Sequence, residues 1–428
     1  MNRIGFPSKL FVRNLCRRLL RILRWKYHGP IPDWYFYRHG GVDAARVTAL
    51  ANASGIRKFE IVLTHCWGGG ANMYLDGKIE KAVKNERGVF LVKPNERFFG
   101  ILNVELLTAA DSISFVVRDL SAFHGLVGKC NKIVVNELVL WHLYDKTRSV
   151  SVDSMERLVK EILLLKTTLT ADMLYLVHDY YCLCPSFNLI MPNGRYCNSE
   201  KTMSNCIECK PFGRHSKRKS GNTVERWRRC FACLFSNCSE IRTFSQDTKS
   251  RINACFANVC PTVVPHELTR KIGRKPDISR GGMVIGVFGN IQPQKGAFEV
   301  VALGNYLGRI GRNDVKIIVV GNFSGVSSPM PSVMKIYGEY KVEDLPDIIE
   351  REGVNIGFMP SIWPETFSYV THEIMAMGLP VVCFDIGAQR DAVAKYEKGM
   401  VAKSMTAEAV WEAIELLYNM ERNGRQYS

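Results

Sequence analysis

Two glutamates, Glu365 and Glu373, lie eight residues apart in the stretch PSIWPETFSYVTHEIMAMGLP, which covers residues 360–380. An apolar run of strand length precedes the stretch, and the Gly-Leu-Pro at its end is typical of a helix stop. The pattern predicts a helix over 366–377, with one glutamate at its start and the other two turns along. Two carboxylates in this arrangement can accept hydrogen bonds from the hydroxyl groups of a polyol.

The predicted start of this helix is a candidate anion site. Backbone N–H groups near Phe367 and Ser368 have no partner within the helix and can donate to a phosphate. A carboxylate beside them opposes binding of a phosphate alone, but it suits a phosphate attached to a polyol. In the alternative interpretation, Glu365 complements the helix dipole and Glu373 is a solvated surface residue; the flanking sequence favours the first interpretation.

The stretch GVFGNIQPQKG, residues 286–296, is a second candidate phosphate site. It combines a strand, a glycine turn and a Lys-Gly pair that opens a helix. Asn290 stands near the start of the same loop. By itself, a lysine at the start of a helix is more often a solvated surface residue.

Two further loops follow predicted strands. In THCWGGG, residues 64–70, glycines such as Gly69 and Gly70 let the backbone approach a ligand closely, although a tight turn alone would also need them. His178, in the stretch VHDYYCLCP of residues 177–185, follows another strand. The carboxyl ends of parallel strands meet at one edge of a sheet, so the position of this histidine makes it a candidate site residue. In the alternative interpretation it is a structural residue, which is the more common role of a lone histidine.

The chain has 14 cysteines, and several lie close together after His178. A Cys-x-x-Cys pair, with two cysteines upstream, gives a candidate tetrahedral set: Cys184, Cys197, Cys206 and Cys209. A structural zinc ion is favoured over reduced thiols, with Cys230 and Cys233 as an alternative second pair. A closed thiolate set leaves no open position for a substrate, so this zinc ion would be structural. No catalytic metal is expected.

The elements that position these residues alternate between strand and helix. Apolar runs at 59–64, 89–92, 113–117, 132–135 and 173–177 fit buried parallel strands, and a second series begins at 283. Residues 270–282, rich in Lys, Arg, Gly and Pro, fit a linker. The prediction is an N-terminal half over 58–267, with a Cys-rich insertion at about 181–238, and a C-terminal half over 283–428. Both are doubly wound, with a cleft between them.

The first 57 residues form a basic extension. The chain has 57 Lys and Arg against 41 Asp and Glu, a formal charge of +16, and residues 1–28 carry eight basic side chains and no acidic one. Residues 10–26 fit an amphipathic helix, either at an anionic membrane surface or packed on the protein itself. Arginines interrupt the apolar run of this segment every three or four residues, which argues against a secretory signal. No apolar run is long enough to span a bilayer. We expect a cytoplasmic protein, peripheral on the inner face of the plasma membrane.

The stretch 360–380 resembles the E-x7-E signature of retaining glycosyltransferases of family 4, and its Trp-Pro is typical of bacterial polysaccharide-synthesis members. The resemblance implies the GT-B fold: two Rossmann-like domains with an interdomain cleft. It implies that Glu373 binds the ribose of a nucleotide sugar and that Glu365 lies near the transferred sugar. It further implies that the amides at 367–369 and Lys295 bind the diphosphate. The loop of Gly69 and Gly70 would lie near the sugar and the diphosphate, and His178 would hydrogen-bond the sugar. The family usually has an arginine near Asn290, so one cation fewer faces the diphosphate.

The function predicted from these observations is transfer of a sugar, with retention, from a nucleotide-diphosphate donor to a glycan or lipid-linked acceptor. One alternative keeps the GT-B fold but assigns another sugar-nucleotide reaction or no activity. Another is a zinc-containing nucleic-acid-binding protein, suggested by the basic, Cys-rich residues 197–238. Those residues lack aromatics at a recognisable motif spacing, so we expect no nucleic-acid partner.

Overall fold

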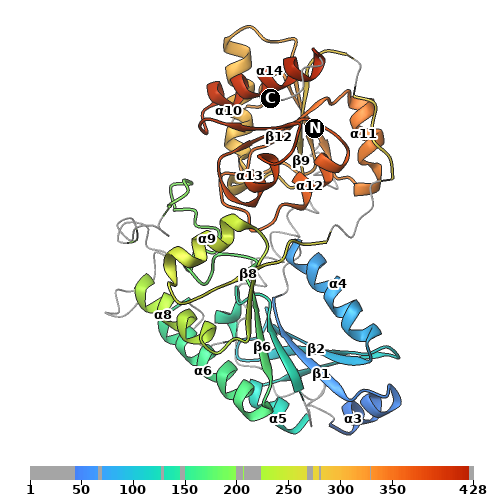
Figure 1. The fold of residues 1–428 in the computed structure, drawn as a ribbon, viewed down its shortest axis with the longest axis vertical. Helices are drawn as coiled ribbons and strands as arrows, with labels where there is room; N and C mark the ends of the chain where they lie inside the picture. The colour runs from blue at the N-terminus through green and yellow to red at the C-terminus, as the bar shows by residue number, and fades with distance from the viewer. Residues whose placement is uncertain are drawn as a thin grey trace, which may run out of the picture. The chain divides into compact units, whose positions relative to one another are not determined.

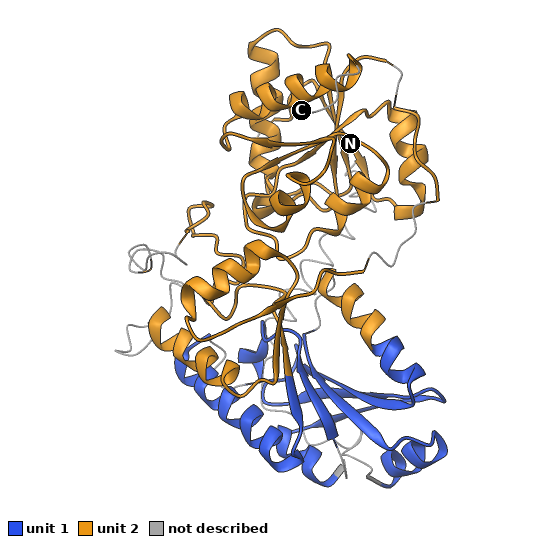
Figure 2. Cartoon of the chain, in the orientation of Figure 1, with its two compact units in different colours: residues 1–67, 79–173 blue, residues 68–78, 174–428 orange. Residues whose placement is uncertain are grey.

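A computed structural model describes most of the chain (Figure 1). The described residues are 44–65, 70–126, 130–144, 150–198, 206, 223–267, 273–278, 281–327 and 329–423. The predicted helix at 10–26 and the predicted site residues Gly69 and Cys209 lie outside them. The chain forms two compact units, residues 1–67 with 79–173 and residues 68–78 with 174–428 (Figure 2). Strands and helices alternate in unit 2, as the sequence predicts. In unit 1, by contrast, residues 87–117 form three successive strands with no helix between them.

Unit 1 contains a sheet portion of mixed direction. Its strands are β1 (Lys58–Leu63), β2 (Arg87–Pro94), β3 (Leu102–Leu107), β4 (Ser112–Val117) and β5 (Cys130–Val135), in the order β4-β3-β2-β1-β5. β1 pairs in parallel with β2 and β5, whereas β3 pairs antiparallel with β2 and β4. The run at 113–117 was expected to be parallel, and this expectation is wrong. The helices are α3 (Ala44–Ala53), α5 (Phe123–Leu126) and α6 (Val152–Leu169).

Unit 2 contains the whole second sheet and three strands of the first sheet, the first of them from Leu174 onward. The three strands are β6 (Asp172–Leu176), β7 (Glu240–Thr243) and β8 (Thr262–Val263), and they pair in parallel. Helices α8 (Val224–Phe235) and α9 (Gln246–Cys255) connect them along the chain. The first turns of α4 (Gly70–Lys84) also belong to this unit.

The second sheet is parallel and reverses its strand order in the middle. It is ordered β11-β10-β9-β12-β13-β14. These are β9 (Val284–Phe288), β10 (Lys316–Val320), β11 (Met334–Gly338), β12 (Ile356–Met359), β13 (Val381–Phe384) and β14 (Gly399–Ala402). The chain moves outward from β9 to β11 and then outward the other way from β12 to β14. The reversal between β9 and β12 opens a crevice beyond their carboxyl ends, which is where ligands bind in such sheets.

Helices cover both faces of this sheet. They are α10 (Ala297–Arg309), α11 (Leu345–Glu352), α12 (Tyr369–Ala376), α13 (Gly387–Val393) and α14 (Ala407–Arg422). α10 and α14 pack on one face and α11 on the other (Figure 1). Successive strand residues alternate between the two cores, so Ile317 lies in one and Ile318 in the other. Burial on both faces explains why these strands are continuous apolar runs. None of the described helices has the length and hydropathy needed to cross a bilayer.

Candidate functional site

A pocket of about 460 Å³ lies within unit 2 at the carboxyl ends of β9 and β12. Its position is the one that the reversed strand order favours for a ligand. It brings together eight of the residues singled out in the sequence: Gly70, Asn290, Lys295, Glu365, Phe367, Ser368, Tyr369 and Glu373. They come from three separate segments of the chain, so the fold and not local sequence makes the pocket.

An ion pair stands inside this pocket. The Nζ atom of Lys295 lies 2.7 Å from Oε1 of Glu365, and the side chains are 36% and 5% exposed, respectively. The same ammonium lies 5.7 Å from the centroid of the Trp363 ring. The lysine is therefore a pocket residue with two partners, not a solvated surface residue. Its partial exposure leaves it able to exchange Glu365 for a ligand anion.

The loop that carries Lys295 is locked to the loop after β12. Gly296 adopts the left-handed conformation, with φ of +85°, and a Cβ atom there would stand 1.9 Å from the Pro360 carbonyl oxygen. Only glycine fits that position. The Ile362 N–H also donates to the Gln294 carbonyl, at 3.3 Å. These contacts explain why Lys295 can meet a residue that follows a different strand.

The loop that carries Glu365 is fixed from a third side by the start of α13. The Ala388 N–H donates to the Glu365 carbonyl at 2.8 Å, and the Gln389 side-chain amide donates to the Trp363 carbonyl at 3.1 Å. Gly387 makes the approach feasible, because a Cβ atom there would stand 2.6 Å from the Glu365 nitrogen. The glutamate is therefore held by its backbone, which leaves its carboxylate available to the pocket.

Glu373 lies on α12, on the side that faces the pocket. The helix begins at Tyr369, three residues later than predicted, because Ser368 is still extended at its N-cap. Glu373 is 5% exposed and lines the pocket. The interpretation of this residue as a solvated surface glutamate is therefore wrong.

His178 lies beside the Glu365 loop, although it does not line the pocket. Its backbone carbonyl accepts a hydrogen bond from Thr366 Oγ1 at 2.8 Å. Its ring stacks on Phe244, with centroids 4.4 Å apart, and contacts the edge of Tyr74. Gly70 lies at the pocket, where a Cβ atom would come within 2.9 Å of the Tyr369 ring.

A stack of four rings borders the pocket and includes a histidine that the sequence did not indicate. Its order is Tyr74, His266, Phe367 and His372, and each pair of neighbours has centroids 4.4 Å apart. His266 is 8% exposed, and neither ring nitrogen has a hydrogen-bond partner among the described residues. Burial, and secondarily His372, lowers the pKa of His266 to about 3. The ring is therefore neutral at ordinary pH and packs like an aromatic side chain.

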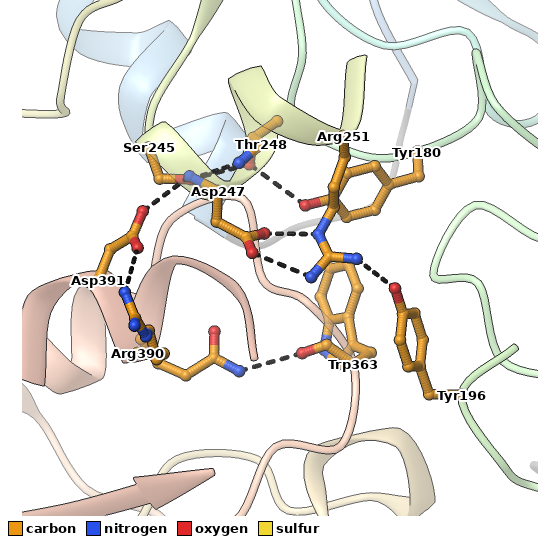
Figure 3. Close-up of polar contacts among 10 residues, drawn as sticks. Tyr180, Tyr196, Ser245, Asp247, Thr248, Arg251, Trp363, Arg390 and Asp391 are labelled. Carbon is orange, nitrogen blue, oxygen red and sulfur yellow. Dashed lines mark hydrogen bonds and ion pairs between the residues drawn. The ribbon is translucent and has the colours of Figure 1, made fainter. Parts of the chain in front are cut away.

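A polar network joins α13 to α9 (Figure 3). Oδ2 of Asp391 accepts a hydrogen bond from the Asp247 N–H in the first turn of α9, at 2.7 Å. The Asp247 carboxylate in turn binds Arg251 at 2.6 and 2.9 Å, and Arg251 also donates to the Tyr196 hydroxyl. Asp391 thus places a negative charge at the positive end of α9. Since α13 also holds the Glu365 loop, the network reaches the pocket.

The structure describes three of the four cysteines of the predicted zinc set. Cys184 and Cys197 are buried and Cys206 is partly exposed, whereas Cys209 lies outside the described residues. Over the described ranges, no group of three or more His, Cys, Asp and Glu side chains is arranged to hold a metal ion. Because one ligand of the set is outside those ranges, the zinc site stays a prediction.

Residues 269–428 match the family model for glycosyl transferases group 1. Three solved structures are similar over most of the chain, each with a TM-score of 0.50. Anabaena Alr3699/HepE in complex with UDP is 13% identical (85% of this chain, 91% of that chain). Sucrose-phosphate synthase (tll1590) from Thermosynechococcus elongatus is also 13% identical (85% and 90%). The lipopolysaccharide outer core galactosyltransferase WaaB is 11% identical (86% and 91%).

No curated protein sequence matches the chain. At these identities the likeness to solved structures concerns the fold. Both sheets of this chain have parallel cores flanked by helices. The similar solved structures are GT-B glycosyltransferases. The predicted fold class is confirmed.

Proposed function

We propose that this protein is a glycosyltransferase that moves a sugar from a nucleotide-diphosphate donor to a glycan or lipid-linked acceptor. The observation that carries the proposal is the pocket, in which Lys295, Glu365 and Glu373 converge at the carboxyl ends of β9 and β12. Most of its lining residues fall within 269–428, the part of the chain that matches the glycosyltransferase model.

Each polar group of the pocket suits one part of such a donor. Glu373 accepts hydrogen bonds from the ribose hydroxyls, and backbone N–H groups at the start of α12 donate to the diphosphate. Lys295 stabilises the charge that develops on the diphosphate as the sugar leaves it. Glu365 then faces the transferred sugar. His178, whose backbone binds the residue after Glu365, is a proposed sugar contact.

Finer features of the reaction belong to the proposal as well. Retention of the anomeric configuration, membership of family 4 and a role in surface polysaccharide synthesis rest on the resemblance of the E-x7-E stretch. We propose no catalytic metal, because Lys295 supplies a cation where the leaving group forms. The HepE structures contain UDP or UDP-glucose, so UDP-sugars are the first donors to test.

The test is sugar transfer by the full chain. It is incubated with UDP-, GDP-, ADP- and dTDP-sugars and with lipid-linked and oligosaccharide acceptors, and the released nucleoside diphosphate and the product are measured. We expect release with one donor class, and an anomeric configuration in the product that matches the donor. Lys295→Ala should abolish it, whereas Lys335→Ala, which changes a surface lysine paired with Glu352, should not. If the full chain neither binds nor turns over any donor of the panel, the proposal is contradicted.

A membrane location is a separate part of the proposal. Residues 10–26, which lie outside the described residues, carry a leucine-rich stripe and arginines, and each basic residue near an anionic surface contributes about 1 kcal/mol. Deletion of residues 1–28 should release the protein from phosphatidylglycerol vesicles and leave its melting temperature unchanged. If the segment packs on the protein instead, the deletion lowers the melting temperature. Unchanged vesicle binding would remove the reason for a membrane anchor.

A further inference from the structure

Ser361 is a buried polar residue of the pocket, and its hydroxyl has no hydrogen-bond partner among the described residues. It follows the end of β12 by two residues, lines the pocket and is 1% exposed. Its Oγ atom makes no hydrogen bond within the described parts of the chain. A buried hydroxyl without a partner lowers the stability of the folded state, so its presence at this position requires an explanation.

The charge of the pocket supplies one reason for such a hydroxyl. Among the described lining residues, Lys295 is the one cation, and Glu365 and Glu373 are the two carboxylates. One positive and two negative groups leave a formal charge of −1. A diphosphate carries negative charge of its own, so neutral hydrogen-bond donors must bind part of it. A serine hydroxyl is such a donor, and its hydrogen bond to a charged oxygen is stronger than one between neutral groups.

The position of Ser361 places it against the loop that carries the cation. The residue before it, Pro360, presents its carbonyl to Gly296, and the residue after it, Ile362, donates to the Gln294 carbonyl. Gly296 and Gln294 are the immediate neighbours of Lys295. Ser361 is therefore held on both sides to the loop whose lysine would bind the leaving group.

We propose that the Ser361 hydroxyl donates a hydrogen bond to the diphosphate of the sugar donor, beside Lys295. The assignment rests on the proposed function and adds a binding residue to it. When the ligand draws the Lys295 ammonium away from Glu365, a phosphate oxygen becomes the acceptor for the Ser361 hydroxyl. The hydroxyl is unpaired without the ligand and paired with it.

This assignment gives Ser361→Ala a distinctive signature. Removal of an unpaired hydroxyl should leave the ligand-free protein as stable as the wild type or more stable, because no hydrogen bond is lost. The same change should weaken binding of a nucleoside diphosphate roughly tenfold or more, the effect of losing a hydrogen bond to a charged group. Binding of the bare nucleoside should not change, since it has no phosphate.

The experiment is isothermal titration of the full chain with UDP, GDP, ADP and dTDP and with the four matching nucleosides, alongside urea unfolding without ligand. Ser404→Ala, an exposed serine bonded to Thr406, is the control and should match the wild type throughout. Equal diphosphate affinities for Ser361→Ala and wild type would overturn the assignment and leave the proposed function intact. Parallel loss of nucleoside affinity and stability would also overturn it, because it would indicate a structural role. If the wild type binds no member of the panel, the proposed function fails and this assignment fails with it.

Discussion

The ammonium of Lys295 and a carboxylate oxygen of Glu365 lie 2.7 Å apart, although 70 residues separate them in the chain. One follows β9 and the other follows β12, the two strands at which the sheet reverses its order. Without a ligand each group serves as the counter-ion of the other. A donor that binds between them must therefore replace an existing ion pair.

This relationship predicts a stability effect that is separate from activity. Lys295→Ala leaves a carboxylate of 5% exposure without its cation and should lower the free energy of unfolding by roughly 1–2 kcal/mol, less than for a fully buried pair because the lysine is partly exposed. The double variant with Glu365→Gln should recover most of that loss, since no charge remains unpaired. Urea unfolding of the two single variants and the double variant measures the coupling. Strictly additive losses would show that the pair is not energetically coupled.

A second prediction separates the two ends of the donor. Glu373→Gln should weaken binding of a nucleoside and of its diphosphate by the same factor, roughly tenfold, because the ribose is common to both. Lys295→Ala should weaken only the diphosphate. Calorimetric titration of each variant with both ligands makes the comparison, and Glu408→Gln, on an exposed face of α14, is the control. A selective effect of Glu373→Gln on the diphosphate would reverse the proposed orientation.

The third prediction is a pH dependence of stability that arises from His266. Burial lowers its folded-state pKa to about 3, whereas an unfolded histidine has a pKa of about 6.5. Between these values the unfolded chain binds a proton that the folded chain does not. The contribution of His266 to the free energy of unfolding is therefore complete above pH 6.5. As the pH decreases below this value, the free energy of unfolding falls by at most about 1.4 kcal/mol per pH unit.

His266→Phe keeps a ring in the stack and removes the titrating group. Its free energy of unfolding should fall less than that of the wild type between pH 7 and pH 5, as urea unfolding at several pH values will measure. His124→Gln changes an exposed histidine and should follow the wild-type curve. Parallel curves for His266→Phe and wild type would mean that the ring is not the source of the pH dependence.

The fourth prediction concerns the hydrogen bond between Asp391 and the start of α9. Asp391→Ala removes an acceptor and a negative charge from the helix N-terminus and should cost about 1 kcal/mol of stability. Asp391→Asn, which keeps an acceptor, should cost less. Asp385→Asn changes the other carboxylate near Arg390 and is the control, since its side chain is 68% exposed. If Asp385→Asn lowers the stability as much as Asp391→Ala does, the lost interaction is the one with Arg390 and not the hydrogen bond to α9.

The fifth prediction concerns metal. If Cys184, Cys197, Cys206 and Cys209 bind zinc, the freshly purified full chain should contain about one equivalent, because a structural site uses four ligands. Elemental analysis measures it, with Cys260→Ser, an exposed cysteine outside the set, as the control for incidental binding. Protein that is folded and active without zinc would exclude the site.

The buried parts of unit 2 could be predicted from the sequence. The second series of strands and helices, predicted to begin at 283, agrees with the structure, in which β9 begins at Val284. Residues of β9 and β10 lie in the cores on both faces of the sheet, so these strands are continuous apolar runs in the sequence. By contrast, β3 and β11 were not predicted. Buried and partly exposed residues alternate along β3, and every residue of β11 is at least partly exposed, so neither contains a continuous apolar run.

The pocket could be predicted only in part. Glu365, Glu373 and Lys295 stand in recognisable stretches, but their convergence needs the strand order. His266 had no signal, since it lies after β8 in a segment without periodicity. Asp391 and Asp247 are 144 residues apart and come from helices that do not follow one another in the chain. A contact of that kind leaves no local pattern in either helix.

The packing of Lys295 on Trp363 gives the protein its own optical reporter. The emission energy of an indole depends on nearby charge, and the ammonium of Lys295 lies 5.7 Å from the ring centroid. A ligand that draws the lysine away changes the field at this ring, so the fluorescence of Trp363 should shift as the pocket fills. The chain has seven tryptophans, and a variant that retains Trp363 with the others replaced by phenylalanine would isolate the signal. Occupancy of the pocket then becomes visible with unlabelled ligands, before any acceptor is known.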